Sequence, residues 1–445
     1  MSQRPMKSLV TISILLSLAW GGCWGSLAAQ QPSSPGVVSI SLEDAIKRAQ
    51  SSSTAFAAAN TDAQVAQSER TIVRSALLPN VVYHNQYLYT QGTGASNGFR
   101  FIANNAVHEY VSQGSVTETI GGAALADYRR TTAEAAAARA RLEVARRGLV
   151  VTVVGNYYGV FAADAKLSVA QRALDEAKHF GSITGKRESN GEVAHADSVR
   201  SDLQIQQRQR ELNDAKLAAD SARLDLGVLL FNDPATPYTL TTSMEELPAL
   251  PERSEIEAAA TAHNPDLKAA MESLHAAQLG VTSARLGYLP DLALNYSYGI
   301  DSAQFAVRAP DGSRNLGYSG AITFDIPVWD WFATHSKVHE SAVRREQARV
   351  ELTAAERQLI ASLREAYQEA QVSLDQLHLL DTSVQSARES LHLTNLRYSS
   401  GEGNVLEIVD SENTLVQAES SRADGAARYF NALATLQTLT GSMPR

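Results

Sequence analysis

The chain has 445 residues and is mildly acidic, with a formal net charge of −9 at pH 7. Its length allows two or three ordinary domains or one elongated domain, and its many Ala, Leu, Gln, Glu and Arg residues favour long helices over a compact α/β enzyme. The negative charge and the lack of a Lys/Arg-rich stripe argue against a nucleic-acid-binding protein.

Residues 1–28 have the features of a secretory signal peptide. Arg4 and Lys7 give a positive start, an apolar run covers residues 9–19, and small residues follow it. The run is too short to span a membrane. The only cysteine, Cys23, falls in this segment, where it is either removed with the signal or serves as a lipid-attachment site. The mature chain is therefore expected in an oxidising compartment without a supporting disulfide.

The chain contains a tandem repeat with an offset of about 210 residues. "SALLPNVVYHNQYLY" at 75–89 matches "LGYLPDLALNYSYGI" at 286–300. Tyr157 of "GNYYGVF" matches Tyr367 of "EAYQEAQ". Matches in constant order over such distances indicate a duplication. We expect a first structural repeat over 29–240, a Pro-rich linker over 241–253 and a second repeat over 254–442.

Each repeat begins with one helical segment that ends near a proline, and two candidate strands follow. In the second repeat, apolar residues alternate with polar residues from Leu292 to Ile300, which predicts a strand with one apolar face. We expect the strand pairs within 80–120 and 291–328, the last strand including Ile326 and ending at Pro327. Strand tyrosines form either an interfacial aromatic belt or ordinary cross-strand pairs: Tyr83, Tyr87, Tyr89, Tyr296, Tyr298 and Tyr318.

A long helical hairpin completes each repeat, over about 125–231 and 330–441. Its apolar residues recur at intervals of three and four, which is typical of a coiled-coil seam: Leu377, Leu380, Val384, Ala387 and Leu391. Each arm before the turn covers roughly 60 residues, or ~90 Å at 1.5 Å per residue. Such a helix is far longer than those of globular domains.

The four strands of one chain cannot close a barrel, and open sheet edges are not tolerated in lipid. Copies must therefore pool strands if the sheet crosses a membrane, two copies giving eight and three giving twelve. The hairpins would then form a tube that extends away from the membrane. The pattern leaves one alternative open, a non-catalytic coiled-coil scaffold in the periplasm or on the cell surface.

The order of these parts resembles the TolC-like outer-membrane efflux protein family. The resemblance covers essentially the whole mature chain, and the segments that carry it are "LLPNVVYHNQY", "YLPDLALNYSY", "AHNPDLKAA", "FDIPVWDW", "LRYSSGEGNVLEIVD" and "LATLQTLTG". It implies a mainly α fold with a small β part. Three copies would form a twelve-stranded β-barrel in the outer membrane of a Gram-negative-type bacterium, continued by a long periplasmic α-barrel.

The resemblance also implies a function and partners. The channel would be the exit duct of a tripartite efflux pump or a type I secretion system and would conduct solutes passively. Expected partners are outer-membrane lipid, a periplasmic adaptor protein and an inner-membrane transporter of the RND or ABC type. The sequence does not identify the transported substrate.

In the family, the turns of the two hairpins lie where the tunnel narrows. By residue match, Glu407 and Asp410 take lumen-facing positions near the constriction. Asp197 and Tyr398 match polar contacts that hold the entrance closed, and Gly403 replaces the Arg that completes this network. Rings of carboxylates favour cations. The alternative is a solvated turn, in which the acidic residues stabilise the start of a helix.

The resemblance assigns adaptor contacts to the same turns. Their apolar residues either pack between helices or meet the adaptor, and the candidate contacts are Gly191, Glu192, Val193, Gly401, Glu402, Gly403, Val405 and Leu406. The chain also departs from the family pattern, because Asp330, Trp331 and Phe332 replace the usual Asp-Gly-Gly.

No motif predicts an enzyme or a cofactor site. The sequence lacks a phosphate-binding glycine loop, a G-x-S-x-G elbow and an H-E-x-x-H helix. His335 and His339 have the spacing of two metal ligands, but no third ligand is near, so an exposed polar face is expected. His195 is a candidate pH sensor because it adjoins a turn. The spacing of the helix carboxylates is typical of solvated faces.

Overall fold

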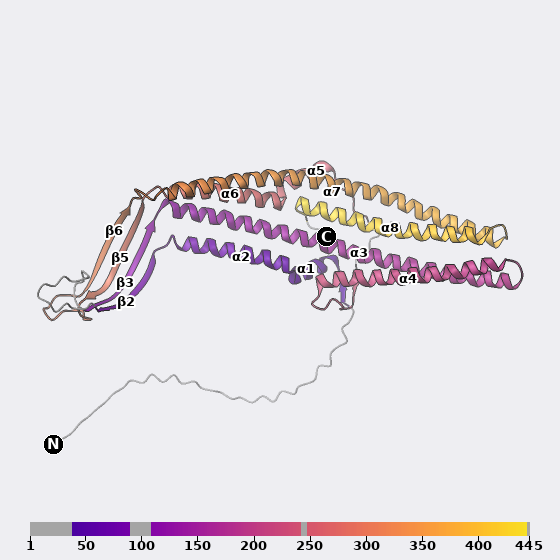
Figure 1. The fold of residues 1–445 in the computed structure, drawn as a ribbon, viewed down its shortest axis with the longest axis horizontal. Helices are drawn as coiled ribbons and strands as arrows, with labels where there is room; N and C mark the ends of the chain where they lie inside the picture. The colour runs from indigo at the N-terminus through magenta and orange to yellow at the C-terminus, as the bar shows by residue number, and fades with distance from the viewer. Residues whose placement is uncertain (1–37, 90–107, 242–246, 443–445) are drawn as a thin grey trace, which may run out of the picture.

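The computed structural model describes residues 38–89, 108–241 and 247–442. The predicted signal peptide, Cys23 and part of the predicted linker lie outside these ranges. The described chain is long and narrow, with a sheet at one end and two helical hairpins at the other (Figure 1). In the described part of the chain, no helix combines the length and the apolar character needed to cross a membrane.

Within the described residues, both halves contain two short helices, two long strands and two long helices, and the first half adds the short strands β1 and β4. The first half consists of β1 (Val38–Ile40), α1 (Leu42–Ser52), α2 (Thr54–Ser75), β2 (Asn80–Tyr89), β3 (His108–Ile120), α3 (Gly122–Ser189), α4 (His195–Leu230) and β4 (Tyr238–Leu240). The second half consists of α5 (Arg253–His263), α6 (Pro265–Leu286), β5 (Asp291–Ser302), β6 (Leu316–Asp325), α7 (Ala333–Ser399) and α8 (Val405–Thr440).

The two halves repeat at a constant offset. The helices α2 and α6 begin 211 residues apart (54 and 265), as do the strands β2 and β5 (80 and 291) and the helices α3 and α7 (122 and 333). The predicted tandem-repeat fold is therefore confirmed.

The first helical segment of each half is two helices, where the sequence predicted one. Ser53 ends α1 and caps α2, its side chain accepting a hydrogen bond from the Phe56 amide. Asn264 does the same for α6, accepting from the Leu267 amide at 2.9 Å, with Pro265 at the first position of the helix. These are strong helix-start signals, and each begins a new helix.

The four long strands form one antiparallel sheet in the order β2-β3-β5-β6. One cross-strand row contains Tyr83, Gly114, Tyr298 and Tyr318, so the tyrosines lie on a single face, as the period-two pattern predicts. This face is exposed in the single chain. Within the described residues β2 and β6 each have one unpaired edge.

The last strand is shorter than predicted. The strand β6 ends at Asp325, so Ile326 lies outside it. Pro327 explains the early end, because proline has no amide hydrogen for the ladder and restricts the residue before it.

Four helices continue from the sheet as a single layer. They lie in the order α2-α3-α6-α7, with α2 and α7 at opposite edges (Figure 1). Beyond this layer, α3 pairs with α4 and α7 pairs with α8 to form the two hairpins, and α8 also packs along α3. The arms α3 and α7 contain 68 and 67 residues. The predicted seam is confirmed, since Leu377, Val384, Ala387 and Leu391 are buried and Leu380 is half-buried.

The main hydrophobic core lies midway along the molecule and includes two strands that were not predicted from the sequence. Strands β1 and β4 pair in parallel and are three residues long, too short for a period-two signal. They bury Ile40, whose carbonyl oxygen accepts a hydrogen bond from the Tyr157 hydroxyl at 3.2 Å. Beside them, Tyr158 stacks on Phe430 with ring centres 4.3 Å apart, which joins α3 to α8.

Candidate functional site

The two hairpins end in turns of the same conformation. Gly191 follows α3 with φ +76°, and Gly401 follows α7 with φ +85°. The amides of Glu192 and Glu402 then donate to carbonyl oxygens five residues earlier, at 2.8 and 2.9 Å. A left-handed glycine with this bond is a common helix ending, and glycine adopts the conformation without steric cost. The turns are thus structural equivalents 210 residues apart.

Arg187 connects the two turns. Its guanidinium donates hydrogen bonds to the carbonyl oxygens of Tyr398 at 3.1 Å and Ser399 at 3.4 Å, and its Cζ atom lies 4.7 Å from the centre of the Tyr398 ring. A positive charge at the carbonyl end of a helix is favourable. Arg187 was not among the residues predicted from the sequence. The repeat offers a signal for it, because Arg397 occupies the same position in the second half.

A small apolar cluster underlies this contact. Phe180 and Tyr398 pack with ring centres 5.1 Å apart, and Val405 and Ile408 are buried against them. The Val405 side chain packs between helices of its own chain, which is one of the two roles expected for the apolar turn residues. Leu406 points away from the cluster and is 57% exposed, so it remains a candidate contact.

Glu407 and Asp410 have different surroundings. The Glu407 amide donates to Asn404 Oδ1 at 2.9 Å, and the Glu407 carboxylate lies 3.2 Å from the Arg397 guanidinium. Glu407 thus stabilises the start of α8, as the solvated-turn alternative proposes. Asp410 is exposed and has no ion pair with any described residue. Of the two carboxylates, Asp410 carries the less compensated charge.

The remaining gate candidates do not form a network within one chain. Asp197 lies in the first turn of α4, 4.0 Å from the Arg200 guanidinium. The Tyr398 hydroxyl is buried and has no hydrogen-bond partner among the described residues, so it makes no hydrogen bond to Asp197. At Gly403 a Cβ atom would lie 2.9 Å from the Tyr398 backbone nitrogen, so this turn has no space for the Arg that the family favours.

A charged cluster lies along α8 beyond the turn. Glu412 is only 7% exposed, and burial raises its pKa to about 7, with Glu176 of α3 adding to the rise and Arg208 of α4 opposing it. A cavity of about 400 Å³ between α3, α7 and α8 lies beside it. The assignment of all helix carboxylates to solvated faces is therefore wrong for Glu412.

Glu419 of α8 forms ion pairs with α3 and α7 beside the same cavity. Its carboxylate lies 2.6 Å from the guanidinium groups of both Arg172 of α3 and Arg388 of α7. These hydrogen bonds hold the pKa of Glu419 below its ordinary value although burial acts in the opposite direction. One carboxylate of the second hairpin is thus bound to the first hairpin.

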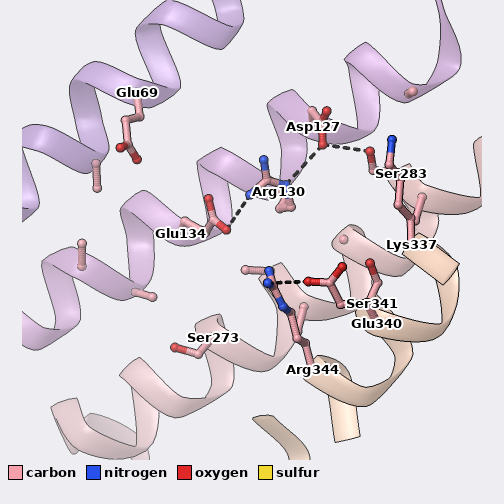
Figure 2. A pocket seen from close by; sticks show the side chains of 18 of the residues that line it. Glu69, Asp127, Arg130, Glu134, Ser273, Ser283, Lys337, Glu340, Ser341 and Arg344 are labelled. Atoms are coloured by element: carbon pink, nitrogen blue, oxygen red, sulfur yellow. Dashed lines mark hydrogen bonds and ion pairs between the residues drawn. The ribbon is translucent and has the colours of Figure 1, made fainter. Parts of the chain in front are cut away.

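A larger groove, of about 1050 Å³, lies nearer the sheet. Figure 2 shows side chains that line it. Residues from all four layer helices line it. The helices α2 and α7 are at opposite edges of the layer, yet both line this groove. This face of the layer is therefore concave. Its lining carries both charges: Arg130 lies between Asp127 at 3.2 Å and Glu134 at 2.7 Å, and Arg344 pairs with Glu340 at 2.6 Å.

The histidine candidates are on the surface. Within the described ranges, no three His, Cys, Asp or Glu side chains are placed to hold a metal ion. His195 is exposed, and its Nδ1 atom lies 2.6 Å from the Glu188 carboxylate, which links the start of α4 to the end of α3.

Comparison with known proteins identifies the family. Residues 45–230 and 258–442 match the sequence profile of the family described as outer membrane efflux protein. The chain belongs to this family. This outer membrane efflux protein is 27% identical to CyaE of Bordetella pertussis over 311 residues, which are 66% of the chain and 62% of CyaE.

Two further comparisons cover more of the chain. This efflux protein is 21% identical to the alkaline protease secretion protein AprF of Pseudomonas aeruginosa over 403 residues, 87% of the chain and 81% of AprF. The CmeC outer membrane channel of Campylobacter jejuni has the same fold, with a TM-score of 0.76 at 17% identity, covering 90% of this chain and 85% of CmeC.

Family membership confirms the predicted outer-membrane location and the predicted role as an exit duct, and it excludes the coiled-coil scaffold. Members of the family are channels, and the helical hairpins are the periplasmic part of such a channel.

Proposed function

We propose that three copies of this efflux protein form one continuous conduit from the periplasm to the exterior. The free edges of β2 and β6 support this proposal, because each edge needs a partner strand in lipid. Pairing β6 of one copy with β2 of the next would join three four-stranded sheets into a closed barrel of twelve strands. The exposed tyrosine-bearing face would then contact outer-membrane lipid.

The concave groove would form part of the channel wall. Three copies of the helix layer would enclose a common lumen, and the groove shown in Figure 2 would face it. Its basic and acidic side chains largely neutralise one another, as in the Arg130 pairs with Asp127 and Glu134. A mixed lining of this kind imposes no strong selection by charge on the passing solute.

Selection and gating would take place at the hairpin turns. Three copies of Asp410 and Glu407 would surround the axis there, with Asp410 supplying most of the cation preference because Glu407 is paired with Arg397. Asp197 and Tyr398 would contribute to closure. Arg187 would hold the two hairpins of one copy together while the entrance is closed.

Partners would act on the exposed parts of the same turns. Leu406, the half-buried Val193 and the glycine turns at 191 and 401 would receive a periplasmic adaptor, which couples the duct to an inner-membrane transporter of the RND or ABC type. Energy would come from that transporter. The family description, efflux, and the name of AprF, protease secretion, support the two corresponding classes of system.

Reconstitution in planar bilayers tests this proposal. The detergent-extracted protein should form long-lived channels, and an oligomer that resists SDS should dissociate on heating. A protein that is extracted without detergent and forms no channels would contradict the proposal.

A further inference from the structure

The segment between β6 and α7 carries three exposed aromatic side chains, which we call the aromatic junction: Trp329, Trp331 and Phe332. Trp331 is 83% exposed, and Trp329 contacts both other rings, with ring centres 5.9 and 5.3 Å away. Large exposed aromatic groups of this kind mark an interaction surface.

The backbone of the aromatic junction is strained. Trp331 has φ 55° and Phe332 has φ 63°, a left-handed conformation that is unfavourable for bulky side chains. The Asp330 carboxylate accepts a hydrogen bond from the Thr334 amide at 2.7 Å and so caps α7 directly after this turn. Strain persists where surrounding contacts compensate for it. Within the described chain, the Asp330 hydrogen bond and the contacts between the rings offset part of this backbone strain. Further contacts with a partner would offset the rest.

The repeat shows where that partner lies. At the offset of 211 residues, Phe332 corresponds to Gly121, just before α3. A Cβ atom at Gly121 would lie 2.1 Å from the Asp291 carboxylate, and one at Gly122 would lie 3.3 Å from the Leu286 side chain. Within the chain, the junction between β3 and α3 therefore packs directly against the junction between α6 and β5.

The aromatic junction can form the equivalent contact only with another copy. The counterpart of α6 and β5 is α2 and β2, where Ser75 stands for Leu286 and Asn80 stands for Asp291. In the single chain, α2 and α7 lie at opposite edges of the helix layer, so these two surfaces do not meet. Leu78, between α2 and β2, and Val81, at the start of β2, also expose apolar surface.

We infer that the aromatic junction of one copy packs into the junction between α2 and β2 of the next copy. The sizes are complementary at one pair, because Ala333 is larger than its counterpart Gly122 while Ser75 is smaller than Leu286, which faces Gly122 within the chain. This inference rests on the proposed three-copy channel. It assigns a contact between neighbouring copies where the strands meet the helices.

Disulfide trapping tests the contact directly. Cys23 lies in the predicted signal peptide, so a pair introduced into the mature chain has no competing thiol. Asn80→Cys combined with Phe332→Cys, and in a second variant with Trp331→Cys, should give covalently linked dimers and trimers on mild oxidation in membranes. Each single variant and the pair Phe332→Cys with Asp291→Cys are matched controls, and they should give no linked trimers.

The outcomes are distinguishable. If neither pair cross-links while native mass spectrometry shows three copies, the inference is wrong and the proposed channel stands. Quenching of the tryptophan fluorescence by brominated phospholipids in that same trimer would assign the aromatic junction to the lipid headgroup region instead. A single-copy mass would overturn both proposals together.

A stability measurement gives a second readout. Phe332→Gly should lower the temperature at which the SDS-resistant oligomer dissociates by several degrees, with unchanged helix content of the chain. Phe305→Ala removes another exposed aromatic group, in the loop after β5, and should leave that temperature unchanged. Equal dissociation temperatures for Phe332→Gly and the unmodified protein would overturn the inference.

Discussion

Arg187 at the end of α3 donates a hydrogen bond of 3.1 Å to the carbonyl oxygen of Tyr398 at the end of α7. The two residues belong to different hairpins, and the bond closes the last turn of the second hairpin with a side chain of the first. This contact and the carboxylate of Glu419 are two polar links between the hairpins, one at the turns and one beside the cavity of α8.

Replacing Arg187 should loosen the turns. A hydrogen bond from a charged donor contributes roughly 1.5–3 kcal/mol, and partial exposure places this one near the lower limit. Arg187→Ala should therefore increase amide hydrogen exchange at the end of α7 about tenfold. Arg200→Ala, which removes an exposed arginine of α4, is the control. Equal exchange in both variants would show that Arg187 does not hold the turns together.

The two gate carboxylates should contribute unequally to ion selectivity. Asp410→Asn should reduce the cation preference of the channel in planar bilayers more than Glu407→Gln, because Arg397 already compensates Glu407. Asp202→Asn, an exposed carboxylate on α4, should leave the reversal potential unchanged. A larger change in reversal potential for Asp202→Asn than for Asp410→Asn would contradict a gate at these turns.

Packing of α8 should weaken as the pH rises toward 7. The Glu412 pKa is raised from 4.5 to about 7, so the folded state binds a proton that the unfolded state has already lost. The free energy of unfolding should therefore fall between pH 4.5 and 7, by at most ~3 kcal/mol, and stay low above pH 7. Arg208 reduces this effect by favouring the ionised form.

Glu412→Gln should abolish this pH dependence, because an amide does not ionise. Hydrogen exchange of α8 amides at pH 5.5 and 8, corrected for intrinsic rates, measures the difference. Glu402→Gln, at the exposed turn, is the matched control. A pH dependence that persists in Glu412→Gln would assign it to another group.

Gly403 should be intolerant of any side chain. A Cβ atom would lie 2.9 Å from the Tyr398 nitrogen, so Gly403→Ala should destabilise the second turn by about 1–3 kcal/mol. Gly185→Ala, a helical glycine of α3 with open space around it, should be neutral or stabilising. Exchange rates at the two turns separate the variants, and a neutral Gly403→Ala would mean that the turn adopts another conformation.

The periodic parts of the fold were predictable from the sequence because long amphipathic patterns reflect burial directly. The seam through Leu377 and Val384 and the alternation from Leu292 to Ile300 each extend over many residues. The three-residue strands β1 and β4 have no period, and their pairing depends on a core contact between residues about 200 positions apart. The break at Ser53 was missed because a capping serine is also common inside helices.

The candidate site was predictable in its location but not in its contacts. The glycines repeated at 191 and 401 identified the two turns, because a left-handed backbone conformation after a helix favours glycine. The link through Arg187 and the burial of Glu412 depend on how two hairpins lie against each other. Spacing along a single helix contains no information on that arrangement.

The assembly of three copies is the claim on which the channel, the gate and the aromatic junction all depend. Native mass spectrometry of the detergent-extracted protein tests it most directly. We expect a mass three times that of the mature chain. A stable single-copy mass under conditions in which the protein retains its helix and strand content would contradict it.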